Sequence, residues 1–332
     1  MSHHRAVFRT HRRMLLAGSA CALLLPPAFA QRPKARIGWL GWVGAMGASA
    51  SPLALAAFRN GLTDRGWTEG RDLELLVRSG DRKGSAQLAS ELLKLDVDLL
   101  VAQGPMVFGA KTVSGDKPLV FNINGDPVEA GLVSSVSRPG GMLTGVTALS
   151  EELAGKRVEL LREAMRKRTK MAVIANEMHP GVAIERQATY AAAKRLGLEL
   201  SWHPLKAQSD LEGALAAIAR SGAEGLLAIP DNLIYSQSRP LAEFAAAQRL
   251  PSISGSSEFA DAGNLMSYGP STRGYYHQMA GMVDRVLRGA RPGDLAIEQA
   301  RDIEFVLNAK AARAIKLDLP PELQLRADRR ID

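Results

Sequence analysis

The sequence is almost free of cysteine: Cys21 is the only one in 332 residues. A single cysteine cannot close a disulfide within the chain, and it leaves no cysteine pair for zinc or redox chemistry. The fold must therefore be held by packing alone. A chain of about 300 residues is long enough for that, and long enough to divide into two cores.

A strong charge excess is also lacking. The formal net charge is +8, from 42 basic and 34 acidic residues, and four of the arginines lie within residues 1–30. Without those four the remainder carries 38 basic against 34 acidic side chains, or +4. No basic stripe alternates with aromatics, and Arg166-Lys167-Arg168 ends an expected helix, where cations complement exposed carbonyls. We therefore expect no nucleic-acid partner.

No apolar run is long enough to span a membrane. The longest, residues 14–25, is broken by Gly18 and Ser19 and ends at Pro26-Pro27, short of the roughly 20 residues that a bilayer requires. Arginines precede it, and Ala28-Phe29-Ala30 supplies a small-x-small cleavage pattern. Residues 1–30 are predicted to be a signal peptide that directs export to the periplasm, with release after Ala30.

Two variants of this signal remain open. Arg12-Arg13 followed by apolar residues is similar to a twin-arginine signal, which would mean export in the folded state. Cys21 follows small residues, as in a lipoprotein signal, but Gly18 stands where such signals have leucine. Soluble release is therefore favoured over a lipid anchor.

The rest of the chain alternates short apolar runs with helical patterns. This order predicts parallel sheets with helices on both faces. The expected strands are 37–40, 73–77, 97–102, 119–123, 171–175, 198–202, 225–229, 251–254, 264–268 and 303–307. The expected helices are 53–62, 85–95, 106–113, 183–196, 211–219, 241–249 and 272–287.

The two halves repeat one plan. Gly66 and Gly197 follow corresponding helices 131 residues apart, and the Leu-Leu pairs at 99 and 226 are 127 apart. We therefore expect an α/β fold of two doubly wound, Rossmann-like lobes with hinge crossovers. The first lobe is predicted to comprise 36–148 with 263–290, and the second 149–262 with 291–325. Several crossings between lobes would make a hinge.

Ligands of parallel doubly wound sheets bind at the carboxyl ends of the strands. That rule selects loops rich in Gly, Asn, Asp and Ser in both halves, which would face each other across a cleft. The candidate ligand-binding residues are Trp42, Gln103, Gly104, Pro105, Asn124, Asp126, Asn176, Asp231, Asn232 and Gly255.

These residue types are also common where a strand turns into a helix, because they cap helices and tolerate unusual dihedral angles. Asp126 and Asp231 stand out, since a carboxylate near a helix start can both cap the helix and receive an ammonium group. Amide hydrogens at neighbouring helix starts can hold a carboxylate. Together they suggest a clamp for an α-amino acid, with Trp42 as a stacking face or a core residue.

Motifs for enzyme chemistry are lacking. Gly38, Gly41, Gly44 and Gly47 are spaced by three, unlike a dinucleotide fingerprint, and there is no Walker loop, no Gly-x-Ser-x-Gly and no His-Glu-x-x-His. We expect no catalytic residue, metal site or cofactor. Ser256-Ser257-Glu258 near a histidine is the best remaining argument for an exported α/β hydrolase.

Several stretches resemble a known family. They are Phe58-Arg-Asn-Gly-Leu62, Gly66-Trp-Thr-Glu-Gly70, Gly125-Asp-Pro-Val128, Gly131-Leu-Val133, Ser137-Arg-Pro-Gly-Gly141, Thr144-Gly145, Leu153-Ala-Gly-Lys-Arg-Val-Glu-Leu-Leu161, Leu265-Met-Ser-Tyr-Gly-Pro270, Ala309-Lys310 and Leu319-Pro-Pro321. They look like the bacterial ABC-transporter substrate-binding proteins of the tryptophan/tyrosine-binding type, from about Arg36 to the C-terminus.

The resemblance implies a type I periplasmic-binding-protein fold that captures a small solute, such as an amino acid, by hinge closure. Its partners would be that ligand and an inner-membrane ABC permease, and the protein is expected to be a monomer. The pocket carried over would use Gln103-Gly104-Pro105, Asn124, Asp126, Asn176, Asp231 and Asn232. Gln103-Gly104-Pro105 departs from a usual Ser-Gly-Thr-like stretch, and residues 176–180 from a tighter Asn-Pro arrangement.

Two readings besides the hydrolase stay open. A periplasmic sensor subunit would share the fold and differ only in its partner. A cytoplasmic repressor would have the same body but needs a helix-turn-helix head in place of residues 1–30.

Overall fold

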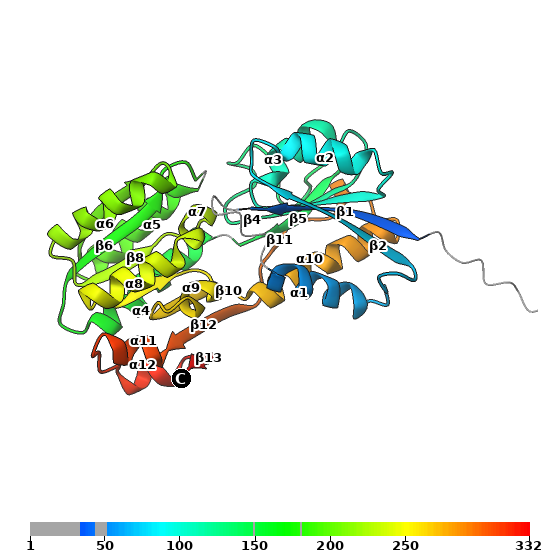
Figure 1. Ribbon diagram of the computed structural model, residues 1–332. Coiled ribbons are helices and arrows are strands. Elements are labelled where there is room, and N and C mark those ends of the chain that lie inside the picture. The colour runs from blue at the N-terminus through cyan, green and yellow to red at the C-terminus, as the bar shows by residue number, and fades with distance from the viewer. Residues whose placement is uncertain (1–33, 44–51, 149, 180) are drawn as a thin grey trace, which may run out of the picture. The chain divides into compact units, whose positions relative to one another are not determined.

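The computed structural model describes residues 34–43, 52–148, 150–179 and 181–332 (Figure 1). The predicted signal peptide, and Gly44 and Gly47 of the glycine series, lie outside these residues. Among the residues described, no helix has both the length and the apolar composition needed to cross a membrane.

The first lobe is built on a six-stranded sheet with the order β11-β5-β4-β3-β1-β2. Every pairing in it is parallel. Ile37 of β1, the strand next to the edge strand β2, lies opposite Leu75 on one side and Leu99 on the other. The strands are β1 (Ala35–Trp42), β2 (Leu73–Gly80), β3 (Leu99–Gln103), β4 (Leu119–Ile123), β5 (Leu143–Thr147) and β11 (Glu298–Gln299).

Helices cover both faces of this sheet, as Figure 1 shows. Alternate residues of β1 supply the two cores: Ile37 and Trp39 pack with α1 (Pro52–Thr63) and α10 (Thr272–Leu287), and Leu40 packs on the other face. That other face carries α2 (Ser85–Leu93) and α3 (Met106–Val113). A strand buried on both sides has no polar face, which explains its continuous apolar run.

The second lobe is built on a seven-stranded sheet with the order β13-β12-β10-β9-β8-β6-β7. Its pairings are parallel except β10 with β12, which is antiparallel. The strands are β6 (Lys170–Asn176), β7 (Glu199–Leu205), β8 (Gly225–Ala228), β9 (Ser252–Ser254), β10 (Met266–Pro270), β12 (Ile303–Asn308) and β13 (Arg329–Ile331).

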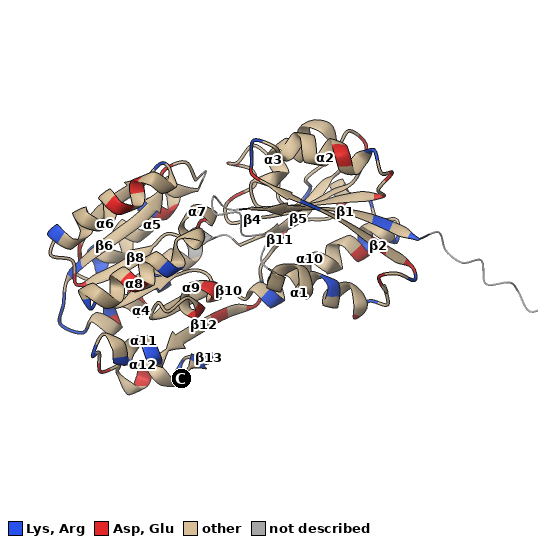
Figure 2. Cartoon of the chain, in the orientation of Figure 1, with Lys and Arg blue, Asp and Glu red and all other residues tan. Residues whose placement is uncertain are grey.

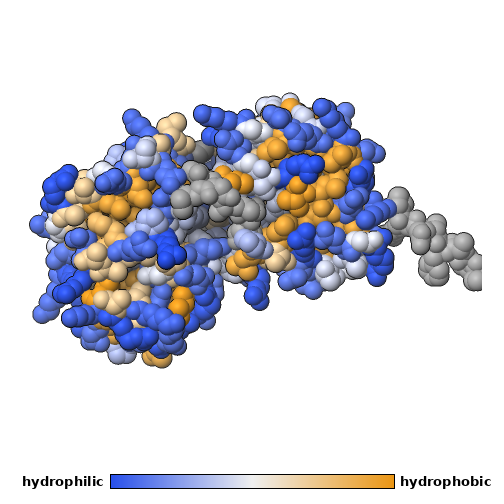
Figure 3. All heavy atoms as spheres, in the orientation of Figure 1, coloured by the Kyte–Doolittle hydropathy of each residue, from blue (hydrophilic) through white to orange (hydrophobic). Residues whose placement is uncertain are grey.

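Two cores again lie on the two faces of the sheet. Val173 and Ala175 of β6 face one core, and Ala172 and Ile174 face the other. The remaining helices are α4 (Ser150–Met165), α5 (Val182–Arg195), α6 (Leu211–Arg220), α7 (Asn232–Ser236), α8 (Ser238–Gln248), α9 (Ser257–Asp261), α11 (Ala309–Ala314) and α12 (Pro321–Leu325), with 3-10 turns at Gln208–Asp210 and Pro292–Asp294. Apolar residues show between hydrophilic ones on both lobes in the space-filling view (Figure 3).

The prediction of an α/β fold with two doubly wound lobes is confirmed. The chain passes from one sheet to the other three times: between β5 and β6, between β10 and β11, and between β11 and β12. The segment 263–290 is divided, because β10 joins the second sheet whereas α10 packs against α1 of the first lobe. Of the segment 291–325, the short β11 pairs with β5 in the first sheet.

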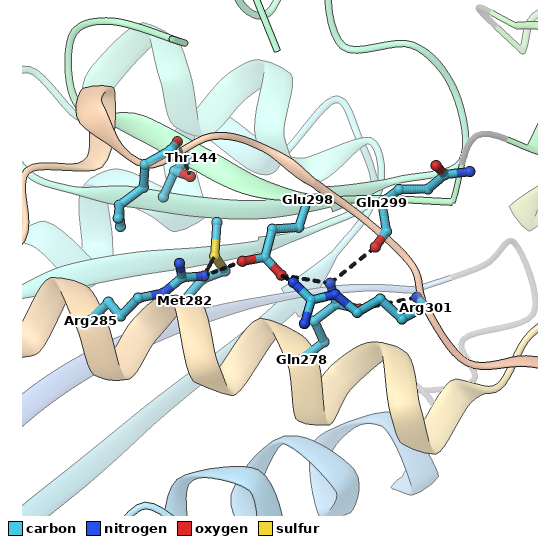
Figure 4. A network of polar contacts seen from close by, with 8 residues as sticks. Thr144, Gln278, Met282, Arg285, Glu298, Gln299 and Arg301 are labelled. Atoms are coloured by element: carbon cyan, nitrogen blue, oxygen red, sulfur yellow. Dashed lines mark hydrogen bonds and ion pairs between the residues drawn. The ribbon is translucent and has the colours of Figure 1, made fainter. Parts of the chain in front are cut away.

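Polar side chains fasten β11 to the first lobe. Figure 4 shows Glu298 between Gln278 and Arg285 of α10 and Arg301. The Glu298 carboxylate accepts hydrogen bonds from Gln278 at 2.8 Å, Arg285 at 2.5 Å and Arg301 at 3.0 Å. Burial alone would raise the pKa of Glu298, but these hydrogen bonds and the arginine charges have the larger combined effect and lower it. The segment just before the last crossing is thus held by an ionised carboxylate.

Candidate functional site

The carboxyl ends of both sheets line one pocket of about 610 Å³. This is the size range of small-molecule sites. All ten residues selected from the sequence lie in its lining, which brings together loops from both lobes. They are Trp42, Gln103, Gly104, Pro105, Asn124, Asp126, Asn176, Asp231, Asn232 and Gly255.

The first-lobe wall is arranged around Gln103, the last residue of β3. Its Oε1 accepts from the main-chain N–H of Trp42 at 3.1 Å, and its Nε2 donates to the Tyr276 hydroxyl. The next residue, Gly104, has φ +54°, and a Cβ there would lie 2.8 Å from Nδ2 of Asn232. The positive φ favours glycine here, and the Asn232 amide of the second lobe lies close to it.

Asp126 stabilises a turn after β4 and not a helix start, since no helix lies among the described residues between β4 and β5. Its Oδ1 accepts from the main-chain N–H groups of Val128 at 2.6 Å and Glu129 at 3.4 Å. Asn124 and Pro105 also line the pocket, and Pro105 directly precedes α3. The Asp126 carboxylate therefore faces the pocket with its charge already stabilised by amide donors.

Asp231 is the most buried carboxylate of the pocket lining, with a relative exposure of 8%. Its Oδ1 accepts from Asn176 Nδ2 at 2.9 Å and caps α7 by accepting from the main-chain N–H of Leu233 at 2.7 Å. Its Oδ2 lies 3.5 Å from Nδ1 of His179. No lysine or arginine within the described residues forms an ion pair with Asp231, so its charge is open to a ligand cation.

Further ionisable groups of the second lobe lie in a row behind this carboxylate. Nε2 of His179 lies 3.9 Å from Oε1 of Glu185, and Oε2 of Glu185 lies 3.5 Å from Nη1 of the buried Arg157. Burial lowers the pKa of His179, and the Asp231 charge opposes this only in part. At neutral pH the imidazole is therefore uncharged and leaves the negative charge of Asp231 unneutralised.

Gly255, the remaining second-lobe candidate, is in a tightly packed position. A Cβ there would lie 2.5 Å from Cγ of Pro230 and 2.9 Å from Nη2 of Arg157. A glycine lets the loop after β9 approach the Arg157 side chain directly. Because Gly255 has no side chain, it lines the pocket with main-chain atoms only.

Sequence reasoning missed the parts of the wall that come from helices, from within a strand and, at Arg82, from the loop after β2. Asn122 lies in β4 between apolar neighbours, and an asparagine at such a position is a signal that could have been used. The missed lining residues with polar or aromatic side chains include Arg82, Phe108, Asn122, Tyr235, Thr272, Tyr275 and Tyr276.

The hydrolase alternative finds no support in the geometry. Ser256 donates to the Glu258 carboxylate, which also accepts from Thr272 Oγ1 at 2.9 Å. Within the described ranges, no histidine hydrogen-bonds to Ser256 or Ser257, so neither serine forms the serine–histidine pair that activates a hydrolase nucleophile. The same described residues include no group of three His, Cys, Asp or Glu side chains arranged to hold a metal ion.

A model of the family described as "ABC transporter substrate binding protein" matches residues 49–331. The chain belongs to this family. The resemblance seen in its signature stretches is thereby confirmed, and so is the type I periplasmic-binding-protein fold.

Individual relatives agree with this assignment. A tyrosine-binding protein of Clostridioides difficile (strain R20291) is 25% identical over 269 residues, which cover 80% of this chain and 76% of the relative. An ABC domain from Streptococcus pneumoniae in complex with L-Trp superposes with TM-score 0.81 at 21% identity, covering 90% of this chain and 100% of that one. A conserved domain protein from Vibrio cholerae superposes with TM-score 0.80 at 24% identity, covering 90% of this chain and 99% of that one.

This substrate-binding protein is therefore a solute-binding component of an ABC transport system that captures a small molecule. The family is one of binding proteins, which fits the lack of an enzyme motif in the sequence. The exported hydrolase and the sensor subunit are not favoured.

Proposed function

We propose that the pocket binds an α-amino acid, or a closely related ammonium compound, and that Asp231 receives the ammonium group. The observation that carries this proposal is the environment of Asp231, a nearly buried carboxylate at the pocket wall. Among the residues that the structure describes, it is bonded by neutral donors and not by a lysine or arginine. The names of the relatives support it, since one is a tyrosine-binding protein and another was crystallised with L-Trp.

The pocket also has groups suited to the rest of an amino acid. The Arg82 guanidinium lies 4.4 Å from the centroid of the Phe108 ring, and both residues line the pocket. An arginine held on an aromatic face in this way has donors left for a carboxylate. Each charge-assisted hydrogen bond contributes on the order of 1.5 to 3 kcal/mol, so two such anchors and burial of a side chain suffice for micromolar affinity, about −8 kcal/mol.

We further propose that capture proceeds by closure of the two lobes about the three crossings, after which an inner-membrane permease accepts the solute. Export by the predicted signal peptide would place the protein in the periplasm. Lysine and arginine are interspersed with acidic residues over both lobes in Figure 2 rather than gathered in one stripe, which supports the absence of a nucleic-acid partner. We propose that the protein acts as a monomer.

The ammonium anchor is tested by thermal-shift screening of the twenty amino acids against the wild type and Asp231→Asn. The substitution keeps the shape and an oxygen for Leu233 but removes the charge. We expect at least one amino acid to raise the Tm of the wild type and to lose most of that effect in the variant.

Asp210→Asn is the matched control. Asp210 also accepts main-chain hydrogen bonds at a helix start of the second lobe, from Lys206 at 2.8 Å and Ala207 at 3.0 Å, but it does not line the pocket. Its variant should keep the full ligand-induced shift. An unchanged shift in Asp231→Asn would refute the ammonium anchor.

A further inference from the structure

Three polar side chains meet on the first-lobe wall of the pocket. They are Gln103 at the end of β3, Asn122 in β4 and Tyr276 in the first turns of α10. The Tyr276 hydroxyl oxygen accepts from Gln103 Nε2 and, at 3.3 Å, from Asn122 Nδ2. Gln103 is fixed in turn because its Oε1 accepts from the main-chain N–H of Trp42.

A count of donors and acceptors shows what this cluster leaves over. Both hydrogen bonds of Tyr276 use its oxygen as an acceptor, so its hydroxyl hydrogen finds no acceptor among the described residues. Asn122 is only 6% exposed, and its Oδ1 accepts no hydrogen bond from any described residue. Buried polar atoms of native proteins are nearly always bonded, so a pair of them at a pocket wall indicates a ligand group.

The Tyr276 hydroxyl keeps its hydrogen under all physiological conditions. Burial raises the pKa of Tyr276 to about 12, although the hydrogen bonds from Gln103 and Asn122 work in the opposite direction. The wall thus presents one fixed donor beside one fixed acceptor. A carboxylate would leave Asn122 Oδ1 unsatisfied, and an ammonium group would leave the tyrosine hydrogen unsatisfied.

The surroundings of this donor and acceptor are aromatic. The Tyr276 ring lies 5.7 Å from that of Tyr275, which lines the pocket together with Trp42 and Phe108. The Trp39 ring, 5.9 Å from that of Tyr276, is buried in the core. Aromatic walls favour a flat ring through offset and edge contacts. The group that satisfies the polar pair should therefore stand on an aromatic side chain.

We propose that Tyr276 and Asn122 form a subsite for a hydroxyl group on an aromatic ring of the ligand. The Tyr276 hydroxyl donates to the ligand oxygen, and the ligand hydroxyl donates to Asn122 Oδ1. Gln103 is a positioning residue that holds Tyr276. This inference rests on the proposed function, because it assigns the side-chain end of an amino acid whose ammonium end is assigned to Asp231.

The test uses two ligand pairs that differ by one hydroxyl: L-tyrosine with L-phenylalanine, and 5-hydroxy-L-tryptophan with L-tryptophan. Isothermal titration of the full chain should show the hydroxylated member of at least one pair binding tenfold or more tighter. A site built to bond a hydroxyl rejects the analogue that lacks it, because its own polar groups are then left unpaired.

Two variants remove the two halves of the subsite independently. Tyr276→Phe removes the donor, and Asn122→Leu replaces the amide by an apolar group of similar shape. Each should reduce the preference for the hydroxylated ligand to less than threefold, mainly by weakening that ligand. Because either variant could also perturb folding, thermal melts of the ligand-free proteins establish that the comparison is between folded forms, and one folded variant is sufficient.

Tyr275→Phe is the matched control. The Tyr275 hydroxyl already donates to the main-chain oxygens of Ile123 at 2.8 Å and Val146 at 3.0 Å, so it has no donor to spare. Its variant should keep the wild-type preference.

Two results would overturn the subsite. Equal affinities within both pairs, or a preference that persists in Tyr276→Phe and Asn122→Leu, would refute it and leave the ammonium anchor intact if binding still requires Asp231. Failure of every amino acid to bind would refute the proposed function, and the subsite with it.

Discussion

His179 shows at the level of one side chain how burial sets a charge state. Its side chain is 10% exposed between the carboxylates of Asp231 and Glu185, yet burial lowers its pKa from the ordinary 6.5. In the unfolded chain the His179 imidazole therefore takes up a proton near pH 6.5, whereas in the folded chain it takes up the proton only at lower pH. Stability should be fully present above about pH 6.5 and should fall as the pH decreases toward the lowered value.

Urea unfolding at pH 7.5 and pH 5.5 tests this sign. The wild type should lose stability between the two, and His179→Gln should lose less because its side chain does not titrate. Burial also lowers the pKa of His203, so His203→Gln serves as the comparison and should remove a smaller part of the loss, since that side chain is less buried. Equal pH dependence in the wild type and His179→Gln would contradict the assignment.

The sequence could predict some site residues and not others for a physical reason. Residues at the carboxyl ends of strands or in the loops after them, such as Asn176 and Asp231, follow from the rule for parallel sheets. Tyr276 could not be found this way, because it lies on a helix that returns to the first lobe from the other end of the chain. That His179 contacts Asp231 depends on the fold of the loop after β6, which the scattered histidines of the sequence did not reveal.

Among the elements, β5 shows how close packing fixes a residue. Gly145 pairs with Phe121 of β4, and a Cβ on it would lie 2.1 Å from the main-chain oxygen of Phe121. Because that oxygen belongs to a buried neighbouring strand, it cannot move aside easily. The sequence analysis did not predict this strand, since Leu143–Thr147 is short and contains a glycine, which weakens any strand pattern.

Gly145→Ala should lower the free energy of unfolding by about 3 kcal/mol, the upper part of the range for overpacking. Gly213→Ala is the matched control, since Gly213 lies within α6 and a Cβ there meets nothing within 4 Å. It should raise stability by about 0.5 to 1 kcal/mol, the usual gain in a helix interior. Chemical denaturation of both variants checks the pair, and similar effects in the two would show that the β4–β5 spacing is not limiting.

For the molecule as a whole, local patterns predicted the two α/β lobes because strand and helix periodicities are local properties. They could not place the last seventy residues correctly in detail. Whether β10 pairs with β9 or with a strand of the first sheet depends on contacts between distant segments, and the two residues of β11 carry almost no pattern. The division of segment 263–290 between the lobes is a property of the fold that its own residues do not encode.

At the scale of the whole molecule, the three crossings join two lobes that share one pocket. Loops from two separately packed sheets line one pocket. The groups that we propose for ligand binding are divided between the lobes: Arg82, Asn122 and Tyr276 on the first, and Asp231 on the second. A ligand that contacts both walls stabilises their approach by its own binding energy. The family assignment and the geometry of the pocket thus lead to the same account of solute capture.

The most direct test of the central claim is mass spectrometry of small molecules released by denaturing the purified protein. The wild type and Asp210→Asn should release an amine-bearing compound, expected to be an amino acid, at near one equivalent, and Asp231→Asn from the same host should release little of it. Retention of the same compound by all three proteins, or release of a stoichiometric compound without an ammonium group, would contradict the account.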